Sequence, residues 1–210
     1  MTVRSLGKLH SYGLNDWLFT LENSGLVLGQ LHSALTDNSL ISETVVGYDS
    51  LLIRVSTPLS EVQLRQIISS ALAESSLETT PAKHHAIIVR YDGPDIDDVC
   101  SATGLSPARV IELHTVPLYT VRFLGFSPGF AYLDGLDPLL QLPRRSTPRP
   151  RMHTGAVAIG GAHAGIYSIP SPGGWNWLGN TEHPLFDKSG TDASAFTLHP
   201  GDTLRFISAD

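Results

Sequence analysis

Residues 155–179, GAVAIGGAHAGIYSIPSPGGWNWLG, decide the fold of the second half of the chain. Short apolar runs at 156–160, 164–169 and 175–179 alternate there with Gly and Pro. Short runs bounded by turn-forming residues are typical of β-strands joined by tight turns. Two further runs, at 118–124 and 203–207, extend the pattern in both directions. The spacing predicts a β-barrel or a β-sandwich for this half of the chain.

A different pattern fills residues 1–92. Strand-like runs at 17–21, 41–46, 50–55 and 86–90 alternate with helical spacing at 26–35 and 64–72. Ser60 and Gln63 form a capping box ahead of the second helix, in which each side chain satisfies a backbone N–H of the other residue. The order β-α-β-β-α-β predicts a split βαβ, ferredoxin-like domain, with two helices on one face of an antiparallel sheet.

Two short helices are expected where the two patterns meet. Asp95 is the predicted N-cap of a helix that ends at Gly104. Ser106 as N-cap and Pro107 at the first helical position begin a second helix that runs to about His114. The sequence therefore predicts an α+β protein, with the ferredoxin-like domain at 1–92 and the β-barrel domain at 93–210.

Composition excludes several classes of protein. The chain has 210 residues, of which 41% are hydrophobic, a share typical of a globular protein. Its net charge of −6 argues against a dedicated nucleic-acid-binding protein. A single cysteine, Cys100, excludes a disulfide framework, and no H-E-x-x-H string indicates a metal site. Residues 1–7 lack the apolar core of a signal peptide, and no run is long enough to span a membrane. We expect a cytoplasmic protein that binds no metal.

One segment of this acidic chain contains no acid. Residues 138–181 lack Asp and Glu but hold Arg144, Arg145, Arg149 and Arg151. An arginine presents a planar fork of donors that matches carboxylates and phosphates. One interpretation is an anion-binding site, and the alternative is a solvated basic loop whose arginines bind loop carbonyls.

Two short motifs resemble a catalytic motif and a nucleotide-binding motif but lack features that those motifs require. Gly125-Phe-Ser-Pro-Gly129 matches G-x-S-x-G, but the nucleophile elbow needs the N–H of the residue after the serine, and Pro128 has none. Residues 160–165, GGAHAG, are not G-x-G-x-x-G, and the chain contains no Walker A string. We therefore expect neither a serine nucleophile at Ser127 nor a P-loop.

The run 113–133, LHTVPLYTVRFLGFSPGFAYL, resembles the signature of the family of B-type 5-oxoprolinase subunits. This family is also called allophanate hydrolase subunit 1 or the KipI family, and is of the carboxyltransferase-domain subdomain C/D type. The resemblance is strong from about Asp92 to the C-terminus and looser before it. It continues through the motifs at 143–149, 155–159, 165–167, 171–175, 185–187 and 200–206.

The resemblance implies a cyclophilin-like β-barrel as the C-terminal domain. It also implies one part of an ATP-dependent hydrolase that converts 5-oxoproline to glutamate, together with the C-type 5-oxoprolinase subunit, which is a KipA-type protein, and the A-type subunit. ATP is then bound by the assembled complex rather than by a P-loop of this chain. Two alternatives stay open, a regulatory inhibitor of a sensor histidine kinase and a protein that processes allophanate or urea-type amides.

Site residues follow from the resemblance as well. His114 matches the His-Thr motif of the family and is a candidate proton carrier, or else a helix-terminal histidine that bonds a backbone carbonyl. Gly173 and Gly174 are either turn glycines with positive φ or points of close approach to a ligand. The implied substrate- or nucleotide-binding set is Arg144, Arg145, Arg149, Phe126, Pro128, Gly129, Phe130, Tyr132, Ser171, Gly173, Gly174 and Trp175. For Phe126, Phe130 and Tyr132 the alternative is a place in the core of the barrel.

Overall fold

The computed structural model describes residues 7–21, 25–75, 82–190 and 192–209. The chain forms two compact units, Met1–Pro81 and Ala82–Asp210. The expectation that residues 1–7 do not form a signal peptide concerns mainly residues 1–6, which lie outside the described ranges.

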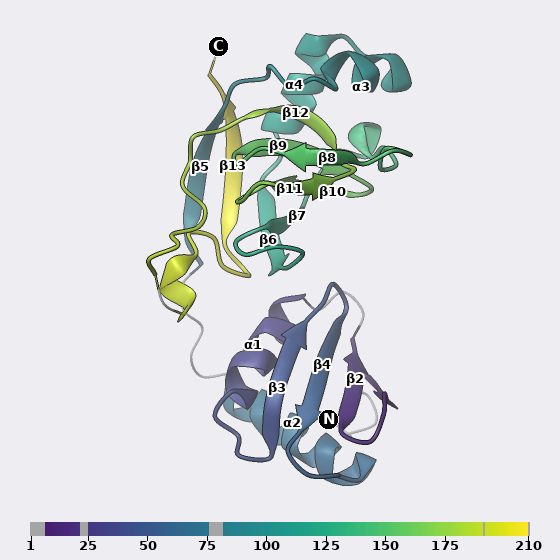
Figure 1. Ribbon diagram of the computed structural model, residues 1–210, viewed down its shortest axis with the longest axis vertical. Coiled ribbons are helices and arrows are strands. Elements are labelled where there is room, and N and C mark those ends of the chain that lie inside the picture. Colours follow the sequence, from purple (N-terminus) through teal and green to yellow (C-terminus); the bar gives the residue numbers. More distant parts are fainter. Residues whose placement is uncertain (1–6, 22–24, 76–81, 191, 210) are drawn as a thin grey trace. The chain divides into compact units, whose positions relative to one another are not determined.

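A four-stranded antiparallel sheet and two helices make up the first unit (Figure 1). The helices contact each other, and their buried leucines, Leu28, Leu31 and Leu64, join a core with Phe19 and Ile53 of the sheet. The sheet order is β1-β2-β4-β3. The elements are β1 (Lys8–Ser11), β2 (Asp16–Thr20), α1 (Gly25–Leu35), β3 (Ile41–Val46), β4 (Ser50–Val55) and α2 (Glu61–Ser75).

The capping box at the start of α2 is confirmed. The Ser60 backbone N–H donates to Oε1 of Gln63 at 2.9 Å, and the Gln63 N–H donates to Oγ of Ser60 at 3.4 Å. These two bonds satisfy backbone donors that the first turn of a helix leaves without partners.

The ferredoxin-like arrangement is not confirmed, because its expected last strand belongs to the other unit. The split unit β2-α1-β3, with β4 between its two strands, is present. The place beside β2 is taken by β1, a strand that sequence patterning did not predict. The expected fourth strand, β5 (His84–Val89), instead pairs in parallel with β13 (Thr203–Ser208). The structure therefore divides the chain after Pro81, whereas the sequence predicted a boundary at Asp92.

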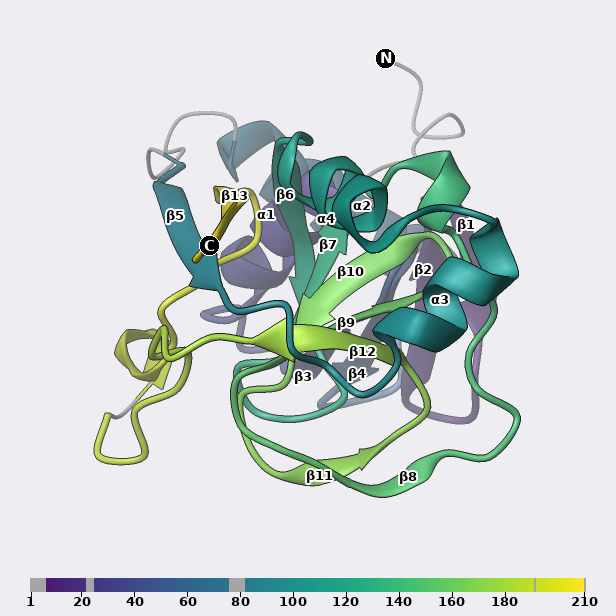
Figure 2. The same cartoon turned by 90° about the horizontal axis from the view of Figure 1, so that it is seen from above.

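The second unit is built on a seven-stranded sheet that curls into a barrel. Its strands follow one another around the barrel in the order β12-β9-β10-β7-β6-β13-β5 (Figure 2). The remaining strands of this sheet are β6 (Tyr119–Leu124), β7 (Ala131–Asp134), β9 (Ala156–Gly160), β10 (His163–Ile166) and β12 (Asn176–Asn180). A separate ribbon pairs β8 (Arg149–Met152) with β11 (Ser171–Gly173).

The two outer strands of this sheet meet at one point, which nearly closes the barrel. Arg90 and Asn180 exchange backbone hydrogen bonds of 2.9 and 2.8 Å, and the Gly93 N–H donates to the Leu178 carbonyl at 3.0 Å. A Cβ at Gly179 would lie 2.3 Å from the Arg90 carbonyl oxygen, so only glycine permits this approach. Of the two architectures that the strand spacing allowed, the barrel is the one observed.

Side chains alternate between the interior and the outside of the barrel. On β9, Val157 and Ile159 join an interior core to which all seven strands contribute. Ala156 and Ala158 point the other way, into a second cluster that includes Met152 of β8 and Trp175, which follows β11. The barrel therefore has an apolar layer on its outer side as well as inside.

Two helices lie between β5 and β6, α3 (Ile96–Thr103) and α4 (Pro107–Thr115), in the places that the sequence predicts. Gly104 ends α3 in the left-handed conformation, and Ser106 Oγ accepts the Arg109 N–H at 3.3 Å at the start of α4. Asp95 is the N-cap residue of α3, as predicted, but its carboxylate makes no capping hydrogen bond. The described part of the unit also contains 3-10 helices at Pro138–Leu140 and Asp192–Ala195.

Candidate functional site

Five aromatic side chains and one arginine gather on the outer side of the barrel. Their rings meet mostly edge-to-face, with centroids 5.4 Å apart for Phe130–Trp175 and 5.6 Å apart for Tyr132–Trp175. Aromatic pairs favour this geometry because the positive edge of one ring faces the negative face of the other. The set, called the aromatic face below, is Phe126, Phe130, Tyr132, Tyr167, Trp175 and Arg144.

Two glycines of neighbouring strands make room for Trp175. A Cβ at Gly160 of β9 would lie 2.8 Å from the indole, and one at Gly165 of β10 would lie 3.0 Å from it. Side chains at these positions would push the indole away from the sheet. Gly160 and Gly165 therefore allow the large ring to lie close against the barrel.

Arg144 supplies the positive charge of the aromatic face. Its guanidinium carbon lies 5.8 Å from the centre of the Trp175 ring, a cation–π arrangement. The side chain is exposed, and the described residues place no carboxylate in an ion pair with it. Burial raises the pKa of the nearby Tyr167 hydroxyl to about 12, so this hydroxyl stays protonated at neutral pH.

Phe126 adopts a backbone conformation that a bulky residue rarely takes. Its φ is +68°, and it is the only non-glycine residue with positive φ in the described part of the chain. This conformation costs on the order of 1 kcal/mol or more for a residue with a side chain. The ring is 61% exposed and contacts Phe130 and Tyr167 edge-on. The turn thus holds an exposed aromatic ring at the border of the aromatic face.

Ser127 lies in the turn that holds Phe126. Ser127 Oγ is buried, and no hydrogen-bond partner for it lies among the described residues. Pro128 contributes its carbonyl, which accepts a short hydrogen bond from Ser168 Oγ. Gly129 has φ +74° and lies close to the Leu185 carbonyl. Ser127, Pro128 and Gly129 therefore shape the turn beneath Phe126.

The strand β11 contains Ser171 and Gly173, and Gly174 lies between this strand and Trp175. Neither glycine has positive φ, which corrects the turn interpretation. A Cβ at Gly173 would lie 2.3 Å from the Tyr167 hydroxyl oxygen, so the position needs glycine for close packing. Ser171 Oγ bonds the Ile169 carbonyl at 3.4 Å.

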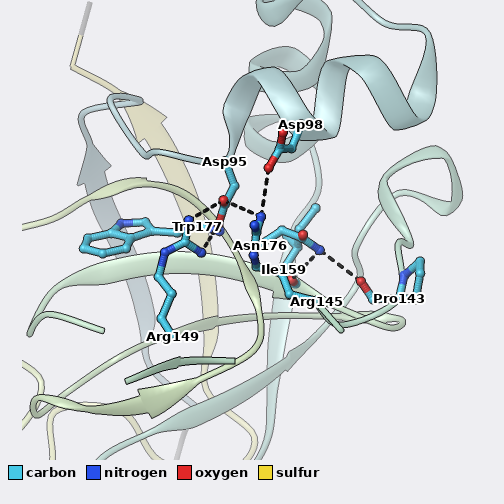
Figure 3. A network of polar contacts seen from close by, with 8 residues as sticks. All are labelled: Asp95, Asp98, Pro143, Arg145, Arg149, Ile159, Asn176 and Trp177. Atoms are coloured by element: carbon cyan, nitrogen blue, oxygen red, sulfur yellow. Dashed lines mark hydrogen bonds and ion pairs between the residues drawn. The ribbon is translucent and has the colours of Figure 1, made fainter. Parts of the chain in front are cut away.

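Two of the four clustered arginines are bound by carboxylates from earlier in the chain (Figure 3). Arg149 forms a two-pronged contact with Asp95, with nitrogen–oxygen distances of 2.7 and 2.6 Å. Arg145 donates to Asp95 at 2.6 Å and to Asp98 at 2.9 Å. The Trp177 backbone N–H donates to Asp95 at 2.7 Å. Asp95 is fully buried, so these donors replace the water that an ionised carboxylate requires.

This network changes the interpretation of the basic segment. Residues 138–181 hold no acid because Asp95 and Asp98, about fifty residues earlier, supply the counter-charges. Arg145 and Arg149 tie their loop to α3 and β12, and Arg144 alone joins the aromatic face. Patterning missed the role of Asp95, since an aspartate before a helix reads as a cap. An open pocket of about 330 Å³ borders the network, between Asp98, Arg145 and Asn176.

His114 lies inside the core. It has no exposed surface, stacks on Phe206 with ring centroids 4.4 Å apart, and contacts the Tyr91 hydroxyl through Nδ1 at 2.7 Å. Burial lowers its pKa to about 3, so the ring is neutral. The carbonyl of the same residue accepts the Tyr119 hydroxyl at 2.9 Å. This placement favours a packing role over proton transfer with a ligand.

Metal-binding side chains do not converge in the described ranges, where no group of three or more His, Cys, Asp or Glu is placed to hold an ion. None of the helices in the described part is both long and apolar enough to cross a membrane.

Comparison with known proteins identifies the family and several relatives of this chain. Residues 9–196 match the family model described as "Carboxyltransferase domain, subdomain C and D". The chain is 39% identical over 170 residues to the B-type 5-oxoprolinase subunit of Haemophilus influenzae, a match that covers 80% of this chain and 79% of the relative. It is 35% identical over 182 residues to the B-type 5-oxoprolinase subunit of Escherichia coli O157:H7, with 85% and 83% covered.

Two further matches cover smaller parts of longer proteins. The crystal structure of TTHA0988 superposes with a TM-score of 0.79 and 35% identity, over 93% of this chain and 39% of that one. Urea amidolyase of Saccharomyces cerevisiae is 30% identical over 122 residues, which are 53% of this chain and 6% of the relative.

Proposed function

Since the chain belongs to the carboxyltransferase-domain family, subdomains C and D, and is a homologue of the B-type 5-oxoprolinase subunits, we propose that it is one part of an ATP-dependent amide-hydrolysing complex. The specific reaction in this proposal is the conversion of 5-oxoproline to glutamate. The complex is completed by the C-type subunit, which is a KipA-type protein, and by the A-type subunit. It acts in the cytoplasm. The names of the relatives support the reaction and the division into subunits.

The observation that carries the proposal is Arg144 lying over Trp175 on the aromatic face. 5-Oxoproline is a small, flat ring that carries a carboxylate. Phe130, Tyr167 and Trp175 are themselves buried and support the exposed Phe126 ring, which suits a flat ligand. An exposed guanidinium without a carboxylate partner among the described residues suits the carboxylate. The other two candidate arginines already bind Asp95 and Asp98, so we assign the substrate carboxylate to Arg144.

ATP has a clear chemical purpose in this reaction. A lactam carbonyl is a poor electrophile, and phosphoryl transfer to its oxygen creates a good leaving group. Such a transfer needs cationic donors around the developing charge. This chain has no P-loop, so we assign ATP binding to the assembled complex.

Purification of the assembled complex tests the proposal. We expect the tagged chain, isolated from its own cells, to elute together with its partner proteins. The interface between them should bury more than about 1,000 Å². The purified complex should form glutamate from 5-oxoproline only when ATP is present. Separate elution of the components at micromolar concentration, or no ATP-dependent glutamate, contradicts the proposal.

The urea amidolyase match favours one second candidate, a protein that processes a urea-derived amide. Allophanate also carries a carboxylate, so the aromatic face and Arg144 suit it on the same grounds. Assaying both compounds with the purified complex separates the two candidates.

We expect Arg144→Lys to raise the KM for 5-oxoproline by about tenfold, the worth of one charge-assisted hydrogen bond. Lysine keeps the charge but loses the two-pronged fork that binds a carboxylate. The thermal midpoint should change little, because the side chain is exposed. Arg109→Lys on α4, an exposed arginine paired with Glu112, is the matched control. Wild-type kinetics in Arg144→Lys would refute the assignment of the carboxylate.

Ser127→Ala should leave most of the activity of the complex intact. The hydroxyl has no hydrogen-bond partner in the described part of the chain, so its removal strands no other group. Steady-state kinetics of the complex check this expectation. A drop of about a thousandfold or more, the scale for loss of a nucleophile, would show that Ser127 reacts with the substrate.

A further inference from the structure

The open pocket of about 330 Å³ beside the Asp95 network has a lining of its own. Asp98 and Ala102, one turn apart on the same face of α3, line one side of it. The loop that leads into β8 lines the other side with Arg145, Ser146 and Thr147, and Asn176 of β12 completes the lining. Sites for small molecules begin at about 300 Å³, so this pocket suits a ligand of modest size.

The register of the sheet turns Asn176 away from the aromatic face. Asn176 pairs with Ile159, whose side chain belongs to the interior core of the barrel. Residues directly opposite each other on antiparallel strands point to the same side of a sheet. Trp175, the preceding residue, belongs instead to the outer cluster. A ligand in the pocket therefore does not occupy the site that we assign to the substrate.

The amide of Asn176 brings an unbonded acceptor to the pocket. The residue is 7% exposed, and its amide nitrogen donates to the carbonyls of Pro143 at 3.1 Å and Ile159 at 3.5 Å. These two bonds fix the amide with its oxygen turned away from both carbonyls (Figure 3). That oxygen accepts no hydrogen bond from the described residues. A nearly buried acceptor without a donor is unfavourable, so the position favours a ligand that carries an N–H group.

Opposite charges lie side by side in the same pocket. Nη1 of Arg145 donates to Asp98 at 2.9 Å and to Asp95 at 2.6 Å, whereas its Nε and Nη2 bond no group in the described part of the chain. The side chains of Arg145 and Asp98 are 30% and 66% exposed, so a ligand can reach both. Asp95 and Asp98 balance the charges of Arg145 and Arg149, which leaves no net charge to favour a simple anion or a simple cation.

We propose that this pocket binds an α-amino acid, whose ammonium contacts Asp98 and the Asn176 amide oxygen while its carboxylate contacts Arg145. An α-amino acid carries a positive and a negative group on one carbon, and the pocket presents a carboxylate and a guanidinium in direct contact. Donors and acceptors of the two partners therefore match, and each contact is a charge-assisted hydrogen bond. The inference goes beyond the proposed function and does not depend on it.

A nuclear magnetic resonance titration of the isotope-labelled full chain tests the proposal, with L-leucine and L-glutamate as probes. We expect at least one of them to shift the side-chain signals of Arg145 and Asn176 until the site is saturated. Analogues of that probe without the amino group or without the α-carboxylate should bind at least about tenfold more weakly, the worth of one charge-assisted hydrogen bond. No saturable shift with either probe, or equal affinity for the analogues, overturns the inference.

Asp98→Asn removes the charge that we assign to the ammonium and keeps the size of the side chain. The affinity for the bound amino acid should fall by about tenfold, because a neutral amide replaces a charged acceptor. Asp97→Asn is the matched control, since Asp97 is an exposed neighbour on α3 that does not line the pocket, and it should keep the wild-type affinity. Equal affinities in the two variants contradict the assignment of the ammonium.

Ala102→Leu tests the location without removing a polar group. Ala102 is exposed on α3, and leucine is a good helix former, so the thermal midpoint should change little. The longer side chain fills the wall of the pocket, and the saturable shifts should disappear. Ala108→Leu, at an exposed position of α4 away from the pocket, should bind as the wild-type chain does. Wild-type affinity in Ala102→Leu would mean that the probe binds elsewhere, which overturns the inference.

Discussion

Replacing Asp95 by asparagine is expected to lower the free energy of unfolding by about 3–5 kcal/mol, the usual cost of removing one partner from a buried ion pair. Asn keeps the size of the side chain but carries no charge. Arg145 and Arg149 then share a confined space without their common counter-ion, and the Trp177 N–H loses a charged acceptor. The loop 143–149 then keeps only the exposed Arg145–Asp98 contact with α3. Urea unfolding followed by circular dichroism measures the effect.

Asp98→Asn is the matched control for this prediction. Asp98 binds the same guanidinium of Arg145, but its side chain is 66% exposed. Exposed ion pairs contribute about 1 kcal/mol or less, because water screens the charges. The two aspartates should therefore differ in effect by severalfold, although they contact the same arginine. Equal effects at the two positions would mean that the burial of Asp95 is not what makes its ion pairs important.

Gly179→Ala is expected to destabilise the second unit by about 3 kcal/mol, at the upper end for overfilling a packed site. The added Cβ would lie 2.3 Å from the Arg90 carbonyl oxygen and 3.0 Å from the Tyr91 Cα. Both neighbours are backbone atoms, which cannot move aside as a flexible side chain can. The strands that close the barrel must separate, so hydrogen exchange at the Arg90 and Asn180 amides should accelerate.

Gly174→Ala is the control for barrel closure. A Cβ at Gly174 would meet its nearest atom at 3.6 Å, an ordinary van der Waals contact, and its φ is not positive. We expect a change of less than about 1 kcal/mol there, as for most substitutions without a packing conflict. If Gly179→Ala unfolds at the same denaturant concentration as Gly174→Ala, the meeting of β5 and β12 does not hold the barrel together.

The sequence by itself determined most elements and the class of the fold. Apolar patterning located α1 and α2 and six of the seven strands of the barrel sheet, although it assigned β5 to the other domain. The spacing of Ser60 and Gln63 located the capping box. The motifs of residues 113–133 pointed to the family that the comparisons show. Phe126, Phe130, Tyr132, Trp175 and Arg144 were named from the family motifs, and the structure brings them together. These features are readable because they depend on a residue and its near neighbours in the chain.

The tertiary structure alone decided which elements pair and which charges meet. The apolar residues within 86–90 predict a strand but not its sheet, and only the pairing of 84–89 with 203–208 assigns that strand to the barrel. Asp95 looks like a helix cap until the loop that carries Arg145 and Arg149 reaches it from about fifty residues away. Local sequence fixes the conformation and the apolar side of a segment. The partner of that segment depends on long-range packing and on neutralising buried charge, which no local pattern encodes.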